Sequence, residues 1–285
     1  MPELSLEKIK SHRAQTYRSL PALRIKTVDE AVEFVNERGF VFFWPIKGVE
    51  LPSLWVAAAG DRSVPDDHDD PGHITWNWKD QLLGKNRWYY GRLLRRRNMI
   101  IALQCLPFFY ALSPNFGDPE HDYLEQYQQG SITLEEKLIY ETLLRKGTLD
   151  TLSLRREARL SSPESSARFN RALEALQIEL KVLPVGISQA GAWKYAFIYD
   201  LVTRHFPKLQ DQARPISEKE ARQHLLLTYL KSVGAASIPK IGRLLGWQPN
   251  MLQKTLEQLC ANGSVKIDVR VEGEKDSCAA LSSLV

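Results

Sequence analysis

One order of elements occurs twice in the second half of this chain and restricts its fold more than any other feature. The first copy is a helix that starts at Pro163, followed by β-rich segments over 180–199. The second copy is a helix that starts at Pro249, followed by a β-rich segment over 265–271. A helix followed directly by a two-stranded wing is the winged form of the helix-turn-helix, which places its last helix in a DNA groove. The repeat therefore indicates a protein that handles DNA.

Local signals divide the chain into three parts. Each part contains a helix start of the capping-box type, at Thr27, Thr133 and Ser217. We therefore expect an α+β, mainly helical fold of tandem winged-helix domains with β wings. The expected domains cover residues 1–130, 131–207 and 208–285. Within them, we expect residues 76–101 to be mostly helical and the polar tail after Glu272 to be disordered.

The composition fits an intracellular globular protein. The chain is 44% hydrophobic and 25% charged, with a net charge of +4, which permits nucleic-acid binding without requiring it. The N-terminus lacks an apolar signal core, and the longest apolar run, over 99–112, is too short to span a bilayer. The cysteines are odd in number and form no Cys-x-x-Cys pair, so we expect no disulfides and a cytoplasmic location: Cys105, Cys260 and Cys278. We also expect a monomer.

A basic and aromatic segment is the first candidate DNA contact. It contains no acidic residue, and Trp88, Tyr89 and Tyr90 lie among its cations. Guanidinium groups bind phosphates, and aromatic faces can stack on exposed bases. The alternative is a partly buried helix whose rings belong to the core. The candidate DNA-binding residues of this segment are Lys85, Arg87, Arg92, Arg95, Arg96 and Arg97.

The helix after Pro163 supplies two further candidates. Its apolar residues fall on one face, and Arg168 and Arg171 point away from that face. Both arginines could contact phosphates or base edges, and Lys254 is a weaker equivalent in the second copy. The alternative role of these residues is packing between domains.

An acidic loop resembles a metal site in residue types alone. It runs from Asp66 to His73 and contains several carboxylates, which hard cations prefer. It lacks EF-hand spacing, and loops of this composition are usually solvated turns, so we expect no metal. The chain also has no P-loop, no Gly-x-Gly-x-x-Gly before a helix and no Gly-x-Ser-x-Gly. We therefore expect no cofactor.

Three short motifs, in this order and spacing, resemble a known family. They are Gly39-Phe40-Val41, the Arg-Ala-Leu-Glu helix segment at 171–174, and Phe206-Pro207 before the last part. Together they are similar to the AlkZ/YcaQ-type crosslink-repair DNA glycosylases, a family of tandem winged-helix proteins. The resemblance implies binding of double-stranded DNA, damaged or intact, and cleavage of N-glycosidic bonds.

The resemblance also identifies where catalysis would lie. The family carries Gln-x-Asp or Gln-x-Gln just after the segment matched by Gly39–Val41, and the matching positions here are Phe42 and Trp44. Neither side chain can accept a proton or hold a nucleophilic water. A replacement carboxylate could come from Glu50, Asp80 or the acidic loop. The open alternatives are a repair glycosylase or damage-binding relative, a non-catalytic DNA-binding regulator, and a protein-interaction module.

Overall fold

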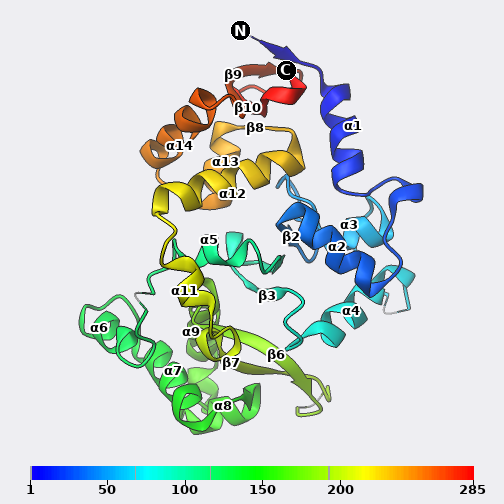
Figure 1. Cartoon of the computed structure of the whole chain (residues 1–285). Coiled ribbons are helices and arrows are strands. Elements are labelled where there is room, and N and C mark those ends of the chain that lie inside the picture. Colours follow the sequence, from blue (N-terminus) through cyan, green and yellow to red (C-terminus); the bar gives the residue numbers. More distant parts are fainter. Residues whose placement is uncertain (1, 68, 116, 192) are drawn as a thin grey trace.

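Three segments of the chain share one order of elements: helix, strand, helix, helix, strand, strand (Figure 1). The structure is a computed structural model that describes residues 2–67, 69–115, 117–191 and 193–285. The first segment covers residues 28–101, the middle segment 134–201 and the last segment 218–281. In each, the third strand lies between the other two, giving the orders β2-β4-β3, β5-β7-β6 and, within a larger sheet, β9-β10-β8. The fold is α+β, as expected.

The first segment begins with a helix that the sequence marks at both ends. The side chains of Thr27 and Glu30 form a capping box, and Gly39 ends the helix. Downstream, β2 and β3 each pair antiparallel with β4. The elements are α2 (Val28–Arg38), β2 (Phe40–Phe42), α3 (Leu54–Ala59), α4 (Ile74–Leu82), β3 (Tyr89–Arg92) and β4 (Asn98–Ile101), with α5 (Leu106–Tyr110) following.

The expectation that residues 76–101 are mostly helical is wrong after Leu82. Residues 89–101 form a hairpin in which Tyr89 pairs with Ile101 and Gly91 with Met99. The physical reason is that both strands bury consecutive large side chains, Tyr89 and Tyr90 in β3 and Met99 to Ile101 in β4, which suits a strand covered on both faces.

The middle segment repeats the plan around a core of its own. Helix α7 starts with the capping box of Thr133 and Glu136, and Ile139, Leu154, Phe169 and Leu176 lie in this core. The elements are α6 (Asp122–Gln128), which precedes the segment, α7 (Leu134–Lys146), β5 (Leu149–Asp150), α8 (Thr151–Glu157), α9 (Ser166–Ile178), β6 (Val182–Ser188) and β7 (Ala196–Leu201).

The last segment is joined by the N-terminus of the chain. Strand β1 pairs parallel with β9, and α1 packs against α12, so the two ends of the chain lie together (Figure 1). The elements are β1 (Glu3–Leu4), α1 (Leu6–Thr16), the linking helices α10 (Val202–His205) and α11 (Leu209–Ala213), then α12 (Glu218–Val233), β8 (Ala235–Ser237), α13 (Ile238–Leu245), α14 (Pro249–Ala261), β9 (Val265–Val271) and β10 (Cys278–Leu281).

The tail after Glu272 is ordered, so the prediction of disorder is wrong. Its residues 278–281 form β10, which is buried between β9 and β8. The small residues Cys278, Ala279 and Ala280 allow this strand to lie in the centre of a sheet. Composition alone suggested disorder because those same residues are weak hydrophobes.

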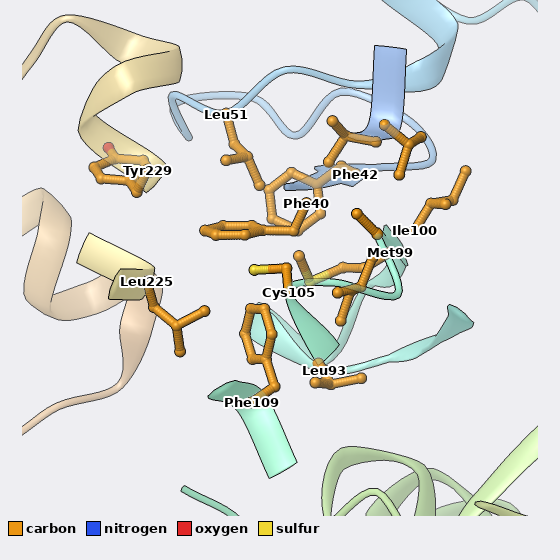
Figure 2. Close-up of a cluster of buried hydrophobic side chains, with 14 of the residues drawn as sticks. Phe40, Phe42, Leu51, Leu93, Met99, Ile100, Cys105, Phe109, Leu225 and Tyr229 are labelled. Carbon is orange, nitrogen blue, oxygen red and sulfur yellow. The ribbon is translucent and has the colours of Figure 1, made fainter. Parts of the chain in front are cut away.

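A large apolar core is shared between the first and last segments. Figure 2 shows Phe40 and Phe42 of β2 close to Leu225 and Tyr229 of α12, with Phe109 of α5 beside them. The domain boundaries at 130/131 and 207/208 stay a prediction. Within the described part of the chain, no helix is long and apolar enough to cross a membrane.

Candidate functional site

The two positions that the resemblance compares with the family's catalytic pair hold one buried and one half-buried aromatic side chain. Phe42 lies in β2 opposite Met99, with no exposed surface, and it belongs to the core in Figure 2. Trp44 follows the strand and is half-buried, with its ring centre 5.6 Å from that of Trp76. An aromatic ring offers neither a proton acceptor nor a water ligand. Phe42 is therefore a residue of the hydrophobic core.

Next to Trp44 and Trp76 lies a buried cation. Lys79 of α4 is 1% exposed, and its Nζ lies 2.7 Å from Tyr195 Oη and 2.8 Å from Asp80 Oδ1. The Tyr195 hydroxyl donates in turn to Asp80 Oδ1 at 2.9 Å. Five rings surround Nζ at 4.3–5.9 Å from their centroids, those of Phe43, Trp76, Tyr90, Tyr195 and Phe197. A cation enclosed by aromatic faces is stabilised electrostatically.

The electrostatics of this cluster favour a neutral tyrosine and a paired lysine. Burial lowers the pKa of Lys79, while its hydrogen bond and charge interaction with Asp80 act in the opposite direction. Burial and the neighbouring Asp80 raise the pKa of Tyr195. The Tyr195 hydroxyl therefore stays protonated, which allows it to donate the hydrogen bond to Asp80. The candidate carboxylate Asp80 thus has two partners, Lys79 and Tyr195, at the same oxygen Oδ1.

The other candidate carboxylate is also paired. Glu50 Oε1 lies 2.9 Å from Lys240 Nζ, and Glu50 Oε2 lies 3.6 Å from Arg13 Nη2. These contacts connect the loop after β2 with α13 and α1. Neither carboxylate is placed as a free general base.

The aromatic residues of the basic segment do not face solvent. Trp88, Tyr89 and Tyr90 are buried, so the prediction that they stack on bases is wrong, and the core alternative describes them correctly. The reason is that Tyr89 and Tyr90 belong to β3, a strand that is covered on both faces, and Trp88 directly precedes it. The cations remain exposed: Lys85, Arg87, Arg92, Arg95, Arg96 and Arg97.

Several of these cations hold the fold together. Arg92 Nη1 and Arg96 Nη2 lie 3.0 and 2.7 Å from the Glu174 carboxylate on α9, and Arg87 pairs with Asp29 at 2.9 Å. Burial would raise the pKa of Glu174, but the hydrogen bonds and charges of the two arginines outweigh it and lower that pKa. The β3–β4 hairpin is thereby fastened to the middle segment.

The tip of that hairpin is conformationally unusual. Arg95 (φ 56°, ψ 20°) and Arg96 (φ 57°) are both left-handed, and the Arg97 N–H donates to the Leu94 carbonyl at 3.1 Å. Such a turn favours Asn-Gly, because a left-handed backbone costs other L-residues roughly 1–2 kcal/mol each. The Arg95 guanidinium donates to the carbonyl oxygen of Arg243 on α13 at 3.3 Å.

The arginines of α9 differ in their surroundings. Arg168 and Arg171 are both exposed, and Arg168 Nη1 lies 3.4 Å from Glu135 of α7. Lys254 is exposed on α14. Because the same helix carries Glu174, its middle part packs against the first segment.

The carboxylates of the acidic loop bind nearby groups: backbone N–H groups of the loop itself and the guanidinium of Arg62. Asp70 binds both terminal nitrogens of Arg62 and accepts from the Gly72 N–H, and Asp67 accepts from the Asp69 N–H. His68 lies outside the described residues. Among those that are described, no group of three or more His, Cys, Asp or Glu side chains could hold a metal ion.

A groove between the segments brings together residues that the sequence did not single out. It has a volume of about 790 Å³, and Arg243 and Trp247 line it together with Arg95 and Arg96. Arg243 lies near the end of the amphipathic helix α13, far along the chain from the basic segment. Only a three-dimensional contact shows that these arginines share one site.

A comparison with solved structures first gives the class of fold. The structure resembles the Streptomyces sahachiroi DNA glycosylase AlkZ, with a TM-score of 0.62 and 16% identity, over 99% of this chain and 71% of that chain. At this identity the likeness concerns the fold. No curated protein matches the sequence significantly.

A family model then gives the particular family. The model described as "AlkZ related" matches residues 25–246, well over half of the chain. This protein belongs to the AlkZ-related family, and the resemblance found from the sequence is confirmed.

Proposed function

We propose that this protein binds double-stranded DNA, intact or damaged, through tandem winged-helix units, and that it acts in DNA repair. The shared order of helices and strands in the three segments supports this proposal, because a winged helix is built in that order. The fold of a DNA glycosylase and the family membership support it as well. We propose further that it acts as a monomer in the cytoplasm.

One observation carries the proposal: Arg95 occupies a strained left-handed position at the tip of the β3–β4 hairpin, whereas its strained neighbour Arg96 is paired with Glu174. A turn selected for stability alone would carry Asn or Gly there. Strain that persists at an exposed tip points to a function for the side chains. Arg95 and Arg97 have no carboxylate partner among the described residues, so their charges are available to phosphates.

Salt-dependent binding tests this proposal. We would measure fluorescence anisotropy of a labelled duplex from 50 to 200 mM salt for the wild type and the Arg95→Ala/Arg97→Ala variant. The variant should bind all sequences more weakly, and its log–log salt slope should be shallower by roughly 0.9 per lost phosphate contact.

The matched control replaces Lys208 and Arg214, which are both exposed in the linker around α11, outside the hairpin and outside the three segments. The Lys208→Ala/Arg214→Ala variant should keep the wild-type slope. An equal slope in all three proteins would exclude the hairpin from the interface. No binding to any duplex would favour the protein-interaction alternative.

We propose that this member does not hydrolyse glycosidic bonds with the family's residue pair. Hydrolysis builds positive charge on the sugar and needs a carboxylate or a polarised water beside it. Phe42 is buried, Trp44 offers a ring, and both Glu50 and Asp80 are ion-paired. Duplexes with alkylated purines, heated in alkali after incubation, should show no strand cleavage. Cleavage that disappears in Asp80→Asn or Glu50→Gln would instead establish a relocated catalytic carboxylate.

A further inference from the structure

The groove where the three segments meet has the composition of a ligand site. Its volume of about 790 Å³ lies in the range of small-molecule pockets. Its lining comes from the β3–β4 hairpin, α5 and the residues after it, the end of α9, α12, and α13 with the residues after it. Apolar side chains form much of it, including Leu93, Leu112, Leu180 and Leu244. The indole of Trp247, half-buried, lies at the same groove.

The charge at this groove is positive. Arg95 and Arg243 donate to backbone carbonyls, and among the described residues neither has a carboxylate partner. Arg96 is balanced by Glu174, and the one acid in the lining, Glu179, lies 3.2 Å from Lys181 Nζ. Two unbalanced guanidinium groups therefore remain beside an apolar surface.

A second cavity extends the positive charge. It measures about 210 Å³ and shares Arg95, Arg243 and Leu244 with the larger groove. It adds Lys47 and Lys240, and its single acid, Glu50, is paired with Lys240 and Arg13. The strained tip of the hairpin thus projects Arg95 between two cavities that favour anions.

We propose that this groove binds one nucleotide, with the base against the leucines and Trp247 and the phosphate on Arg95 and Arg243. Apolar walls beside two arginines match a flat heterocycle joined to a phosphate. An unpaired nucleotide of bound DNA and a free nucleotide share this chemistry. The first source rests on the proposed DNA binding, and the second does not depend on it.

The experiment compares two duplexes that differ in one nucleotide. One carries an unpaired 2-aminopurine, and the other is fully paired. Stacking of one base contributes about 1–3 kcal/mol, so the wild type should bind the first duplex about 5- to 150-fold more tightly than the second. In Leu112→Trp, which fills the groove, and in Arg243→Ala, which removes the phosphate contact, this preference should disappear.

Leu152→Trp is the matched control, because Leu152 is 47% exposed on α8, outside the groove. It should keep the preference. Circular dichroism verifies that each variant folds. If Leu112→Trp does not fold, the test rests on Arg243→Ala, because Arg243 is exposed and its replacement should not affect folding. A preference retained in both groove variants, or a wild type without preference that also fails to bind a free nucleotide, overturns the proposal.

A parallel titration uses the 5′-monophosphate of 2-aminopurine deoxyriboside as the free probe. Saturable fluorescence change that is lost in Arg243→Ala, without duplex binding, supports the groove as a free-nucleotide site and rejects the proposed DNA binding. Binding of the unpaired duplex alone assigns the groove to nucleotides within DNA. Failure of the proposed nucleotide site can therefore be distinguished from failure of the proposed DNA binding.

Discussion

The hydroxyl oxygen of Tyr195 lies 2.7 Å from Nζ of Lys79, and this hydrogen bond joins the middle segment to the first. Tyr195 directly precedes β7, whereas Lys79 lies in α4. The bond is enclosed by rings from both segments, including Trp76 and Phe197. A polar contact in such surroundings is specific, because either partner left alone would be desolvated without compensation.

Replacing Tyr195 by Phe should therefore destabilise the protein by about 1–3 kcal/mol. The ring remains, but Lys79 and Asp80 each lose a hydrogen-bond partner. Urea unfolding measures the effect. Trp193→Ala is the control in the same hairpin, because Trp193 is 91% exposed, and its change should stay within about 0.5 kcal/mol. Equal stability of Tyr195→Phe and wild type would show that the bond contributes nothing to the fold.

A second prediction concerns the close approach of the two segments at Gly84. Its φ is +71°, and a Cβ there would collide with the carbonyl oxygen of Val185 in β6. Gly84→Ala should cost at least about 2 kcal/mol. Gly130→Ala is the matched control, since Gly130 has the same φ of +71° and nothing within 4 Å of its added Cβ. The difference between the two variants isolates the contact, and similar losses would contradict it.

The strained hairpin tip predicts that relieving the strain at Arg95 raises the stability of the fold and weakens DNA binding. Arg95→Asn places a residue that tolerates a left-handed backbone at the first central turn position, and it should stabilise the protein by about 0.5–1 kcal/mol. The same variant should bind duplex DNA more weakly. Thermal unfolding and anisotropy measure the two effects. Arg97→Asn, at an extended position (φ −110°), should weaken binding without the gain in stability.

A pH dependence follows from His224. Its ring stacks on Phe108 with centroids 3.6 Å apart, and burial, then the charge of Lys231, lower its pKa below 6.5. Below pH 6.5 the unfolded chain therefore binds a proton that the folded chain does not, so stability falls as the pH falls. The loss is at most about 1.4 kcal/mol per pH unit for one group.

His224→Phe keeps the stacking and removes this proton, so the decline in urea midpoint between pH 7 and pH 5.5 should become shallower. His121→Phe changes a histidine whose side chain is 68% exposed and serves as the control. A decline of unchanged steepness in His224→Phe would show that other groups cause it.

The sequence was sufficient for the local elements that have strong end signals. The capping boxes at Thr27, Thr133 and Ser217 each start a helix as expected, and Pro249 begins α14. These signals depend on residues only a few positions apart in the sequence, so they can be recognised without knowledge of the rest of the fold. The family resemblance was also visible, because short motifs keep their order along the chain.

Only the tertiary structure decided which side chains are buried and which other side chains they contact. The rings of Trp88, Tyr89 and Tyr90 have the composition of a base-stacking surface, yet all three are buried, Tyr90 against Phe197 of the middle segment and Tyr89 against Phe206 of the linker. Lys79 was not singled out, because its aromatic enclosure is assembled from residues far apart in sequence. Arg95 and Arg243 likewise share a groove only through the packing of the hairpin on α13. Burial and charge pairing depend on contacts between distant segments, and a linear pattern does not contain those contacts.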